Sequence, residues 1–213
     1  MTNSSNDVLL EDACKVYGKK TNEEFRPFEP ISFHLKESEL LYIIGPNGSG
    51  KTTLLRAIAD LTTLEEGKSL HTHEVNFLSS NESQMFDQLT GEENLKYFLG
   101  LRKKLSHIKE VKERWSKVPA FNKAITTKYN LCSKGMKRVL DLCVAFEDCG
   151  TLVLLDEPFH GVDLENKNEI INIVNQFFSN KTIIITSQED PSVDSQRIFD
   201  KKHTTIQIKG AIL

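Results

Sequence analysis

Short aliphatic runs recur along the chain, and longer amphipathic or polar stretches separate them. Three runs are almost entirely apolar, which is typical of strands that are buried on both faces of a parallel sheet. They lie at residues 40–44, 151–155 and 182–186. Stretches with apolar residues at helical spacing lie between them, at residues 51–59, 136–146 and 165–178. This alternation predicts an α/β fold with a helix-flanked, mainly parallel sheet.

Two shorter strands are predicted before the run at 40–44. Residues 8–14 are mainly apolar, and residues 31–35 alternate apolar and polar side chains, as a half-buried strand does. We expect these two strands to form an antiparallel sheet beside the parallel one. Further strands are expected at residues 74–78 and 204–210.

The middle of the chain is predicted to be helical. Thr90 is a candidate N-cap, and Glu93 stands at the position that completes a capping box with it. The spacing of apolar side chains after Glu93 stays helical, with an interruption at Pro119. We therefore expect one domain, residues 1–213, with a helical subdomain inserted at about residues 85–140.

A glycine-rich loop follows the first buried run. Its residues fit the pattern G-x-x-x-x-G-K-[ST], which stands between a strand and a helix in phosphate-binding loops. Glycines let the backbone curl around a phosphate and direct several N–H groups inward, while the next helix adds the positive end of its dipole. We expect Lys51 to reach the β- and γ-phosphates of a nucleotide and the Thr52 hydroxyl to bind Mg²⁺. The loop consists of Gly45, Pro46, Asn47, Gly48, Ser49, Gly50, Lys51, Thr52 and Thr53.

Two acidic residues, Asp156 and Glu157, follow the buried run at 151–155. The carboxyl end of a strand is where α/β sheets bind ligands, so Asp156 is placed to hold Mg²⁺. Glu157 can direct the water that attacks a γ-phosphate, as a general base or as an orienting group. A pair of solvated acids is the alternative, and the upstream phosphate-binding loop favours the catalytic interpretation.

The overall composition is that of an ordinary soluble globular chain. Charged residues make up 27% and hydrophobic residues 38% of the 213 positions. The formal net charge of −3 argues against a broad electrostatic affinity for nucleic acid, and we expect no nucleic-acid partner. Basic residues between positions 102 and 114 alternate with acidic ones, which is typical of a solvated helix face.

The cysteines and the hydropathy of the chain indicate its compartment. The four cysteines form no C-x-x-C pair and no cluster with histidines, which indicates buried free thiols in a reducing compartment. They are Cys14, Cys132, Cys143 and Cys149. The first residues are polar and unlike a signal peptide, and no apolar run approaches the ~20 residues that span a bilayer. We expect a cytoplasmic protein that reaches a membrane only through a partner.

Three motifs in a fixed order give the chain a family resemblance. Besides the loop at 45–53, residues 132–138 are similar to a signature motif of the Ser-Lys-Gly-Met kind, and residues 152–163 are similar to a Walker B strand and D-loop. Over nearly its whole length, the sequence resembles the nucleotide-binding domains of ABC transporters. The resemblance implies a P-loop NTPase core, an N-terminal antiparallel β-subdomain, an inserted helical subdomain, and ATP and Mg²⁺ as ligands.

The resemblance also implies partners. Ser133, the backbone N–H of Gly135 and the helix N-terminus at Met136 would make a second anion-binding surface, which in this family faces the γ-phosphate held by the other subunit. One loop and one signature per chain therefore imply a second ABC ATPase subunit, with two ATP molecules between the partners. Family members also act on an integral membrane permease, at the inner face of the membrane.

One aromatic residue stacks on adenine in this family, and Tyr17 resembles it. Its separation from Gly45 is longer than expected, so Phe25 or Phe28 are alternatives. Each of the three could instead be an aromatic residue of the core.

One departure from the family pattern lies after the run at 182–186. The switch histidine expected there is replaced by Gln188, whose amide can donate a hydrogen bond to a γ-phosphate but cannot carry a positive charge. Because Lys51 and Glu157 are present, we expect ATP binding and hydrolysis, with a turnover that this replacement could slow.

A second departure concerns the glutamine that contacts Mg²⁺ and relays the nucleotide state in this family. It is expected soon after residues 77–78 and is absent there. Ser80 or Asn81 stands in its place, and Gln84 is nearby but out of register.

The leading hypothesis is an ATPase subunit of a multi-subunit ABC transporter. The compact length and the Ser-Lys-Gly-Met signature favour an exporter-type system, such as, by analogy, the haem-handling subunits of cytochrome c maturation. One alternative is a weakly hydrolysing, nucleotide-responsive subunit beside a more active partner. Another is a soluble ABC ATPase that acts on ribosomes or DNA, which usually has two cassettes or long coiled coils. The cargo, and the choice between a homo- and a heterodimer, stay open.

Overall fold

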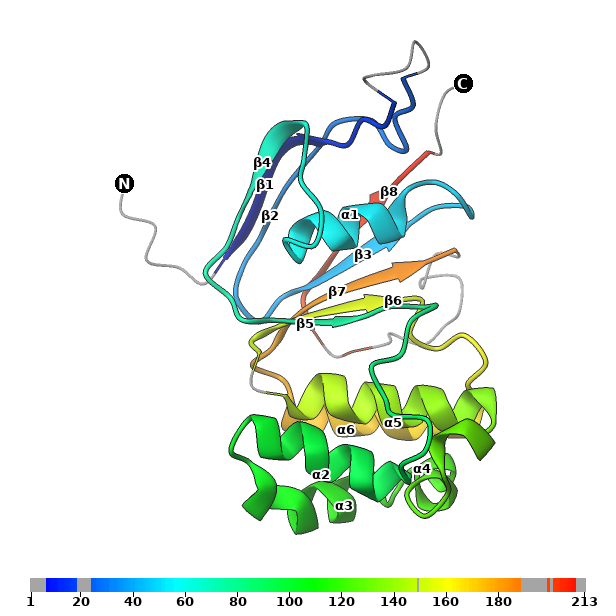
Figure 1. Cartoon of the computed structure of the whole chain (residues 1–213). Helices are drawn as coiled ribbons and strands as arrows, with labels where there is room; N and C mark the ends of the chain where they lie inside the picture. Colours follow the sequence, from blue (N-terminus) through cyan, green and yellow to red (C-terminus); the bar gives the residue numbers. More distant parts are fainter. Residues whose placement is uncertain (1–6, 19–23, 149, 189–198, 200, 210–213) are drawn as a thin grey trace. The chain divides into compact units, whose positions relative to one another are not determined.

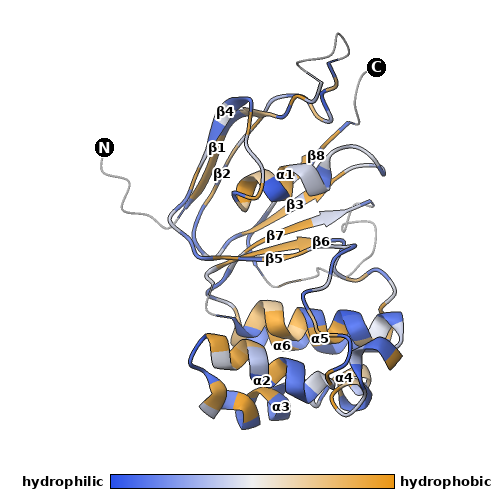
Figure 2. Ribbon diagram, in the orientation of Figure 1, coloured by the Kyte–Doolittle hydropathy of each residue, from blue (hydrophilic) through white to orange (hydrophobic). Residues whose placement is uncertain are grey.

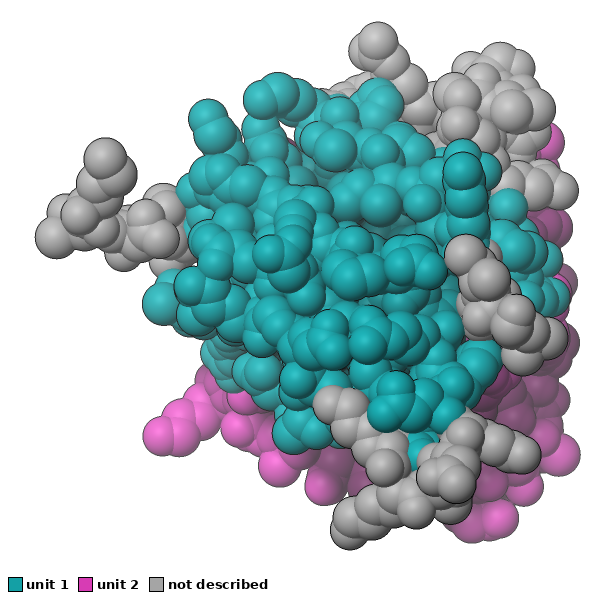
Figure 3. Space-filling model, turned by 90° about the horizontal axis from the view of Figure 1, so that it is seen from above, with its two compact units in different colours: residues 1–77, 151–157, 180–213 teal, residues 78–150, 158–179 magenta. Residues whose placement is uncertain are grey.

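The computed structural model of the chain describes residues 7–18, 24–148, 150–188, 199 and 201–209. The chain divides into two compact units, which Figure 3 shows in different colours. Unit 1 comprises residues 1–77, 151–157 and 180–213, and unit 2 comprises residues 78–150 and 158–179. Cys149 and residue 210, the end of the last predicted strand, lie outside the described residues.

The described strands belong to unit 1, except for the last residue of β5. They are β1 (Val8–Cys14), β2 (Ile31–Leu35), β3 (Leu40–Ile44), β4 (Glu66–Leu70), β5 (Val75–Leu78), β6 (Leu152–Asp156), β7 (Thr182–Ser187) and β8 (His203–Gln207). Each strand predicted from the sequence has a counterpart among them, and β4 is additional.

Five strands form a sheet in the order β5-β6-β7-β3-β8. The pairs β6–β7, β7–β3 and β3–β8 are parallel. Every residue of β3 and β6 is buried, and Figure 2 shows these strands as mostly hydrophobic. The buried parallel strands predicted from the aliphatic runs are therefore confirmed.

A second sheet has the order β2-β1-β4, and both of its pairs are antiparallel. The pairing of β1 with β2 is confirmed, whereas the sequence did not predict β4. The side chains of β4 are mostly exposed, so its sequence lacks the alternation of apolar and polar residues that marks a half-buried strand. Pairing with β1, rather than burial of its own side chains, holds β4 in the sheet.

Helix α1 (Lys51–Ile58) lies between the two sheets (Figure 1). Leu54, Leu55 and Ile58 on this helix have no exposed surface. They share one hydrophobic core with Leu10 of β1 and Ile43 of β3. Burial of each such side chain stabilises the fold by about 1.5–3 kcal/mol. This core fixes the position of α1, and with it the glycine-rich loop that leads into the helix.

Unit 2 is helical. Its elements are α2 (Gly91–Leu101), η1 (Leu105–His107), α3 (Ile108–Trp115), α4 (Pro119–Ala124), η2 (Tyr129–Leu131), α5 (Lys134–Glu147) and α6 (Leu164–Phe177). The predicted capping box of α2 is confirmed, because the Glu93 N–H donates to Thr90 Oγ1 at 3.2 Å and the Thr90 N–H donates to the Glu93 carboxylate at 2.7 Å. Helix α5 begins two residues before the predicted start, since Ser133 caps it. Among the described helices, none combines the length and the apolar character needed to cross a bilayer.

A buried ion pair joins three helices of unit 2. Glu147 of α5 is 8% exposed, and Arg114 Nη1 donates to its two carboxylate oxygens at 2.6 and 2.8 Å. Trp115 Nε1 donates to the same carboxylate at 2.8 Å. The Arg114 guanidinium also lies over the Phe177 ring of α6, 4.6 Å from its centroid. Glu147 therefore ties α3 to α5, and the stacked guanidinium extends the contact to α6.

Removal of the Glu147 carboxylate is expected to destabilise unit 2. Glu147→Ala leaves Arg114 and Trp115 Nε1 without their acceptor, and breaking a buried ion pair costs about 3–5 kcal/mol. Urea unfolding followed by circular dichroism should show that loss. Glu113→Ala, at an exposed position of α3, should change the free energy of unfolding by less than about 0.5 kcal/mol. Equal effects of the two substitutions would contradict this role.

Candidate active site

The glycine-rich loop connects the end of β3 at Ile44 to the start of α1 at Lys51. Gly48 (φ 79°) and Gly50 (φ 88°) adopt the left-handed conformation that favours glycine. A Cβ atom at Gly50 would also lie 2.7 Å from the Phe28 ring. The packing beneath α1 therefore requires glycine at this point and holds the loop in one tight turn.

The loop presents backbone donors that have no acceptor. Within the described part of the chain, no hydrogen-bond acceptor faces several of its N–H groups. These are the N–H groups of Gly48, Gly50, Lys51, Thr52 and Thr53. N–H groups at the start of a helix, together with the positive end of its dipole, form an anion-binding site. The loop geometry therefore fits a phosphate group.

Lys51 adds a positive charge inside this loop. Its side chain is 5% exposed, and its Nζ donates to the carbonyl oxygens of Gly45 at 2.8 Å and Pro46 at 3.0 Å. The same Nζ lies 3.7 Å from Glu157 Oε1. The ammonium is thus held over the loop, where a bound phosphate could replace its carbonyl partners.

Asp156 and Thr52 bring together the oxygen atoms that a hard cation prefers. Asp156 is 1% exposed, and the Thr52 hydroxyl donates to its Oδ2 at 2.8 Å. Its other oxygen, Oδ1, accepts from the Thr186 hydroxyl at 2.7 Å. A carboxylate and a hydroxyl suit Mg²⁺, which is usually held by one or two protein oxygens together with phosphate and water. The residues present therefore fit the predicted ion.

Glu157 lies beside this pair in a rare backbone conformation. Its φ of 46° is left-handed, and its N–H donates to Thr186 Oγ1 at 3.0 Å. Gln188 Nε2 donates to both oxygens of the Glu157 carboxylate, at 3.2 and 3.1 Å. Of the residues predicted from the sequence, Lys51, Glu157 and Gln188 therefore converge in unit 1.

The sequence reasoning missed Thr186, which contacts both acidic residues. Strand register explains its position, because Thr186 of β7 pairs directly with Asp156 of β6. The available signal was a polar residue at the end of an aliphatic strand. That signal is weak, since threonine is a common residue in strands.

The aromatic candidates for adenine stacking separate into two groups. Phe28 is 1% exposed and belongs to the core, which agrees with the alternative of a core aromatic. Tyr17 and Phe25 are 45% and 40% exposed, and their rings stack with centroids 6.5 Å apart. Lys15 Nζ lies 5.2 Å from the centroid of the Tyr17 ring. Tyr17 and Phe25 are therefore the two candidates that are exposed.

The signature-like residues lie in unit 2. Ser133 is the N-cap of α5, and its hydroxyl accepts from the Met136 N–H at 3.2 Å. A Cβ atom at Gly135 would lie 2.9 Å from the carbonyl oxygen of Gly161 in the D-loop-like segment. Asp163 caps α6, where its carboxylate accepts a hydrogen bond from the Asn166 N–H. This hydrogen bond lowers the pKa of the Asp163 carboxyl group. The two segments are therefore packed closely against each other at two helix starts.

The segment after β5 also belongs to unit 2, and its side chains at Ser80, Asn81 and Gln84 are exposed. Ser83, which the sequence did not single out, donates to Asp141 Oδ1 of α5 at 2.9 Å. The Tyr129 hydroxyl donates to the same carboxylate at 3.1 Å. This network ties the segment to the helix that begins at the signature.

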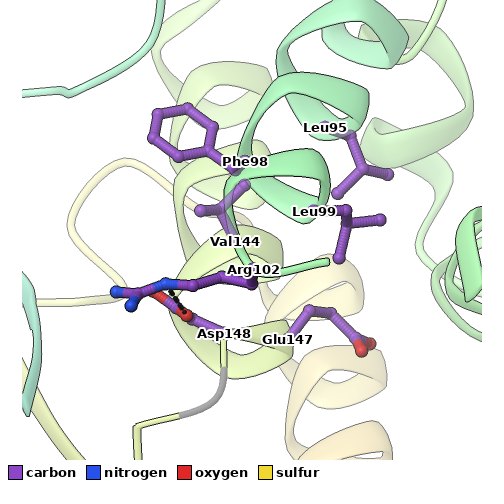
Figure 4. Close-up of a pocket in the computed structure, with 7 residues that line it drawn as sticks. All are labelled: Leu95, Phe98, Leu99, Arg102, Val144, Glu147 and Asp148. Carbon is purple, nitrogen blue, oxygen red and sulfur yellow. Dashed lines mark hydrogen bonds and ion pairs between the residues drawn. The ribbon is translucent and has the colours of Figure 1, made fainter. Parts of the chain in front are cut away.

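A small pocket in unit 2 has a different character (Figure 4). Its walls are mainly apolar side chains of α2 and α5. The Arg102 guanidinium at its edge is paired with Asp148, at 2.7 Å between Nε and Oδ1. The lining residues are Leu95, Phe98, Leu99, Arg102, Val144, Glu147 and Asp148. Because Arg102 is already paired with Asp148 and the other walls are mainly apolar, we do not take this pocket as the candidate active site.

The sequence also matches a family model. The model for the ABC transporter family matches residues 28–160. This region contains the glycine-rich loop, the signature-like stretch and the acidic pair.

Several curated proteins are similar to this chain. The ABC transporter ATP-binding protein NatA of Bacillus subtilis is 30% identical over 200 residues, which cover 84% of this chain and 78% of NatA. The linearmycin resistance ATP-binding protein LnrL of the same species is 30% identical over 195 residues, which cover 84% of this chain and 60% of LnrL. The doxorubicin resistance ATP-binding protein DrrA of Mycobacterium tuberculosis is 26% identical over 229 residues, covering 99% of this chain and 67% of DrrA. The chain spans about half of the length of some curated relatives that it matches.

Solved structures share the fold. The dimeric structure of MJ0796, a bacterial ABC transporter cassette, superposes with a TM-score of 0.78 at 20% identity and covers 95% of this chain and 94% of the cassette. The same cassette in a post-hydrolysis state, bound to ADP and Pi, gives a TM-score of 0.75 at 19% identity, over 96% of this chain and 97% of the cassette. The predicted fold is therefore confirmed. Since the family model covers more than half of the sequence and NatA is matched over most of its length, the chain belongs to the ABC transporter family.

Proposed function

We propose that this chain binds and hydrolyses ATP as the ATPase subunit of a multi-subunit ABC transporter. The observation that carries the proposal is the arrangement in unit 1, where the unpaired N–H groups of the loop lie with Lys51, Asp156 and Glu157 at one site. This arrangement suits two tasks, which are holding a triphosphate and directing a water at its last phosphate.

Nucleotide binding would use the loop and the residues beside it. The loop N–H groups would donate hydrogen bonds to the phosphate oxygens. Lys51 would exchange its two carbonyl partners for phosphate oxygens, which are stronger acceptors. Thr52 and Asp156 would hold Mg²⁺. When bound, the ion would neutralise negative charge that develops on the phosphates. Tyr17 or Phe25 would stack on adenine.

Hydrolysis would depend on Glu157. As a general base or an orienting group, its carboxylate would accept a hydrogen bond from the attacking water and draw its proton away. Gln188 already donates to that carboxylate, so it would orient Glu157 as well as contact the γ-phosphate. The products would be ADP and inorganic phosphate.

A second subunit and a permease would complete the system. The dimer of the MJ0796 cassette and the ATP-binding transporter proteins among the relatives support this part of the proposal. Each partner would present Ser133, Gly135 and Met136 to the ATP bound by the other. The chain would act at the cytoplasmic face of a membrane through an integral membrane permease. Relatives named for linearmycin and doxorubicin resistance favour an exporter-type system.

Glu157→Gln should lower the steady-state ATPase rate of the purified chain by at least about 100-fold, because general-base catalysis contributes on the order of 10²–10⁴. ATP binding should persist, and size-exclusion chromatography with ATP should show a larger dimer fraction than for the native chain. Glu110→Gln, at an exposed position of α3, is the matched control and should change neither quantity.

An unchanged rate in Glu157→Gln would exclude Glu157 as the base. Loss of ATP binding in that variant would instead place Glu157 in the binding site and not in catalysis.

A second candidate function is a nucleotide-responsive subunit that hydrolyses little and pairs with a more active partner. The contacts of Glu157 favour it, because Gln188 occupies both carboxylate oxygens and Lys51 lies 3.7 Å away. A carboxylate held in this way is less available to a water. A glutamine amide also cannot supply the positive charge of a protonated histidine.

Gln188→His tests whether this replacement limits the rate. An imidazole beside the Glu157 carboxylate would titrate near its ordinary pKa of about 6.5 or above it. We expect turnover to rise by about tenfold at pH 6.5 and to fall toward the native rate as the pH rises past 8, since the imidazole loses its charge. Gln176→His, at an exposed position of α6, should leave the pH–rate profile unchanged. If Gln188→His and Gln176→His gave the same pH–rate profile, Gln188 would not be the cause of slow turnover.

A further inference from the structure

One side chain of the candidate active site has no assigned role. Thr186 has no exposed surface, and its hydroxyl makes two hydrogen bonds within unit 1. It donates to Asp156 Oδ1 at 2.7 Å, and it accepts from the N–H of Glu157 at 3.0 Å. A hydroxyl has one donor, so the bond to Asp156 and the bond from Glu157 fix its orientation fully.

We propose that Thr186 is a positioning residue for ATP hydrolysis, which sets the orientation of Asp156 and of Glu157 together. The inference rests on the proposed function, in which these two acids act on ATP. It adds a residue of β7 that contacts neither the nucleotide nor the water and acts only through the two acids.

Thr186 acts on Asp156 by fixing the plane of its carboxylate. The two oxygens of Asp156 each accept from a different hydroxyl, Thr52 on Oδ2 and Thr186 on Oδ1. Donors on opposite oxygens prevent rotation of the carboxyl group. The parallel register makes this possible, because Thr186 and Asp156 are direct partners in β7 and β6. Without the Thr186 hydroxyl, the buried Oδ1 of Asp156 would lose the hydrogen bond that β7 supplies, and the loss of a donor to a buried acceptor is costly.

Thr186 acts on Glu157 through the backbone. A left-handed φ of 46° is unfavourable for a residue with a side chain, so the surrounding structure must hold it. The bond from the Glu157 N–H to Thr186 Oγ1 does so at the point where the chain leaves β6. In this conformation the Glu157 carboxylate lies 3.7 Å from Lys51 Nζ and accepts from Gln188. Loss of the hydroxyl would therefore release the base from its position.

The test compares two threonines of the same strand. Thr186→Val removes the hydroxyl and keeps the shape. Thr182→Val does the same at the other end of β7, where the Thr182 hydroxyl is also buried and accepts from the Ser38 N–H at 2.9 Å. Both variants lose a buried hydroxyl, but only the first loses its contacts to the acids. Thr186→Ser keeps the hydroxyl and removes only the methyl group.

Thr186→Val is expected to lower kcat for ATP hydrolysis by about 30-fold, which is in the range for one hydrogen bond to a charged group. Its KM for ATP should stay within about threefold, because the loop N–H groups and Lys51 are unchanged. Thr186→Ser should restore kcat to within about threefold of the native value, and Thr182→Val should leave it within about twofold. If Thr186→Val does not fold, Thr186→Cys, whose thiol is a weak donor, should give an intermediate kcat.

Suppose that ATP hydrolysis by the native chain depends on Glu157, but that Thr186→Val and Thr182→Val have equal kcat values. That result would overturn the positioning role and leave the proposed function intact. A kcat for Thr186→Ser as low as that of Thr186→Val would also overturn it, since the hydroxyl would then not be the active feature. A native chain without Glu157-dependent hydrolysis would overturn the proposed function and this inference together.

Discussion

The parallel register of β3, β7 and β6 is the constraint on which the rest of unit 1 depends. These strands run in one direction and pair residue by residue, so their carboxyl ends meet at one edge of the sheet. The glycine-rich loop leaves this edge after Ile44, and Asp156 and Ser187 end the other two strands. Residues that are more than a hundred positions apart in sequence are therefore brought together by backbone pairing and by burial of aliphatic side chains.

Burial at this edge requires partners for every charge, because a buried ion without a partner is costly. Each carboxylate oxygen of Asp156 accepts a hydrogen bond from a hydroxyl, and Lys51 donates to two carbonyl oxygens. The Glu157 carboxylate accepts from Gln188. Among the described residues, several N–H groups of the loop and of the start of α1 have no acceptor, and these donors point to a phosphate as the missing partner. The site is thus formed before an anion binds. Binding of a phosphate would replace some of these hydrogen-bond partners and would not need to assemble the site.

Much of this could be predicted from the sequence, because the aliphatic runs, the capping box and the glycine-rich loop are local signals. Strand β4 could not, since its side chains are exposed and only its pairing with β1 defines it. Thr186 could not either, because its role depends on a register that no local pattern specifies. The choice among the aromatics was open for a similar reason. Only the tertiary packing shows that Phe28 is buried while Tyr17 is exposed.

The claim that the loop at 45–53 is a phosphate site for ATP is tested most directly by isothermal titration calorimetry. The purified chain is titrated with ATP, ADP and adenosine in the presence of Mg²⁺. If the unpaired N–H groups and Lys51 supply most of the affinity, ATP and ADP should bind at least about a hundredfold more tightly than adenosine. Equal affinity for adenosine and ATP, or no binding of ATP, would contradict the account.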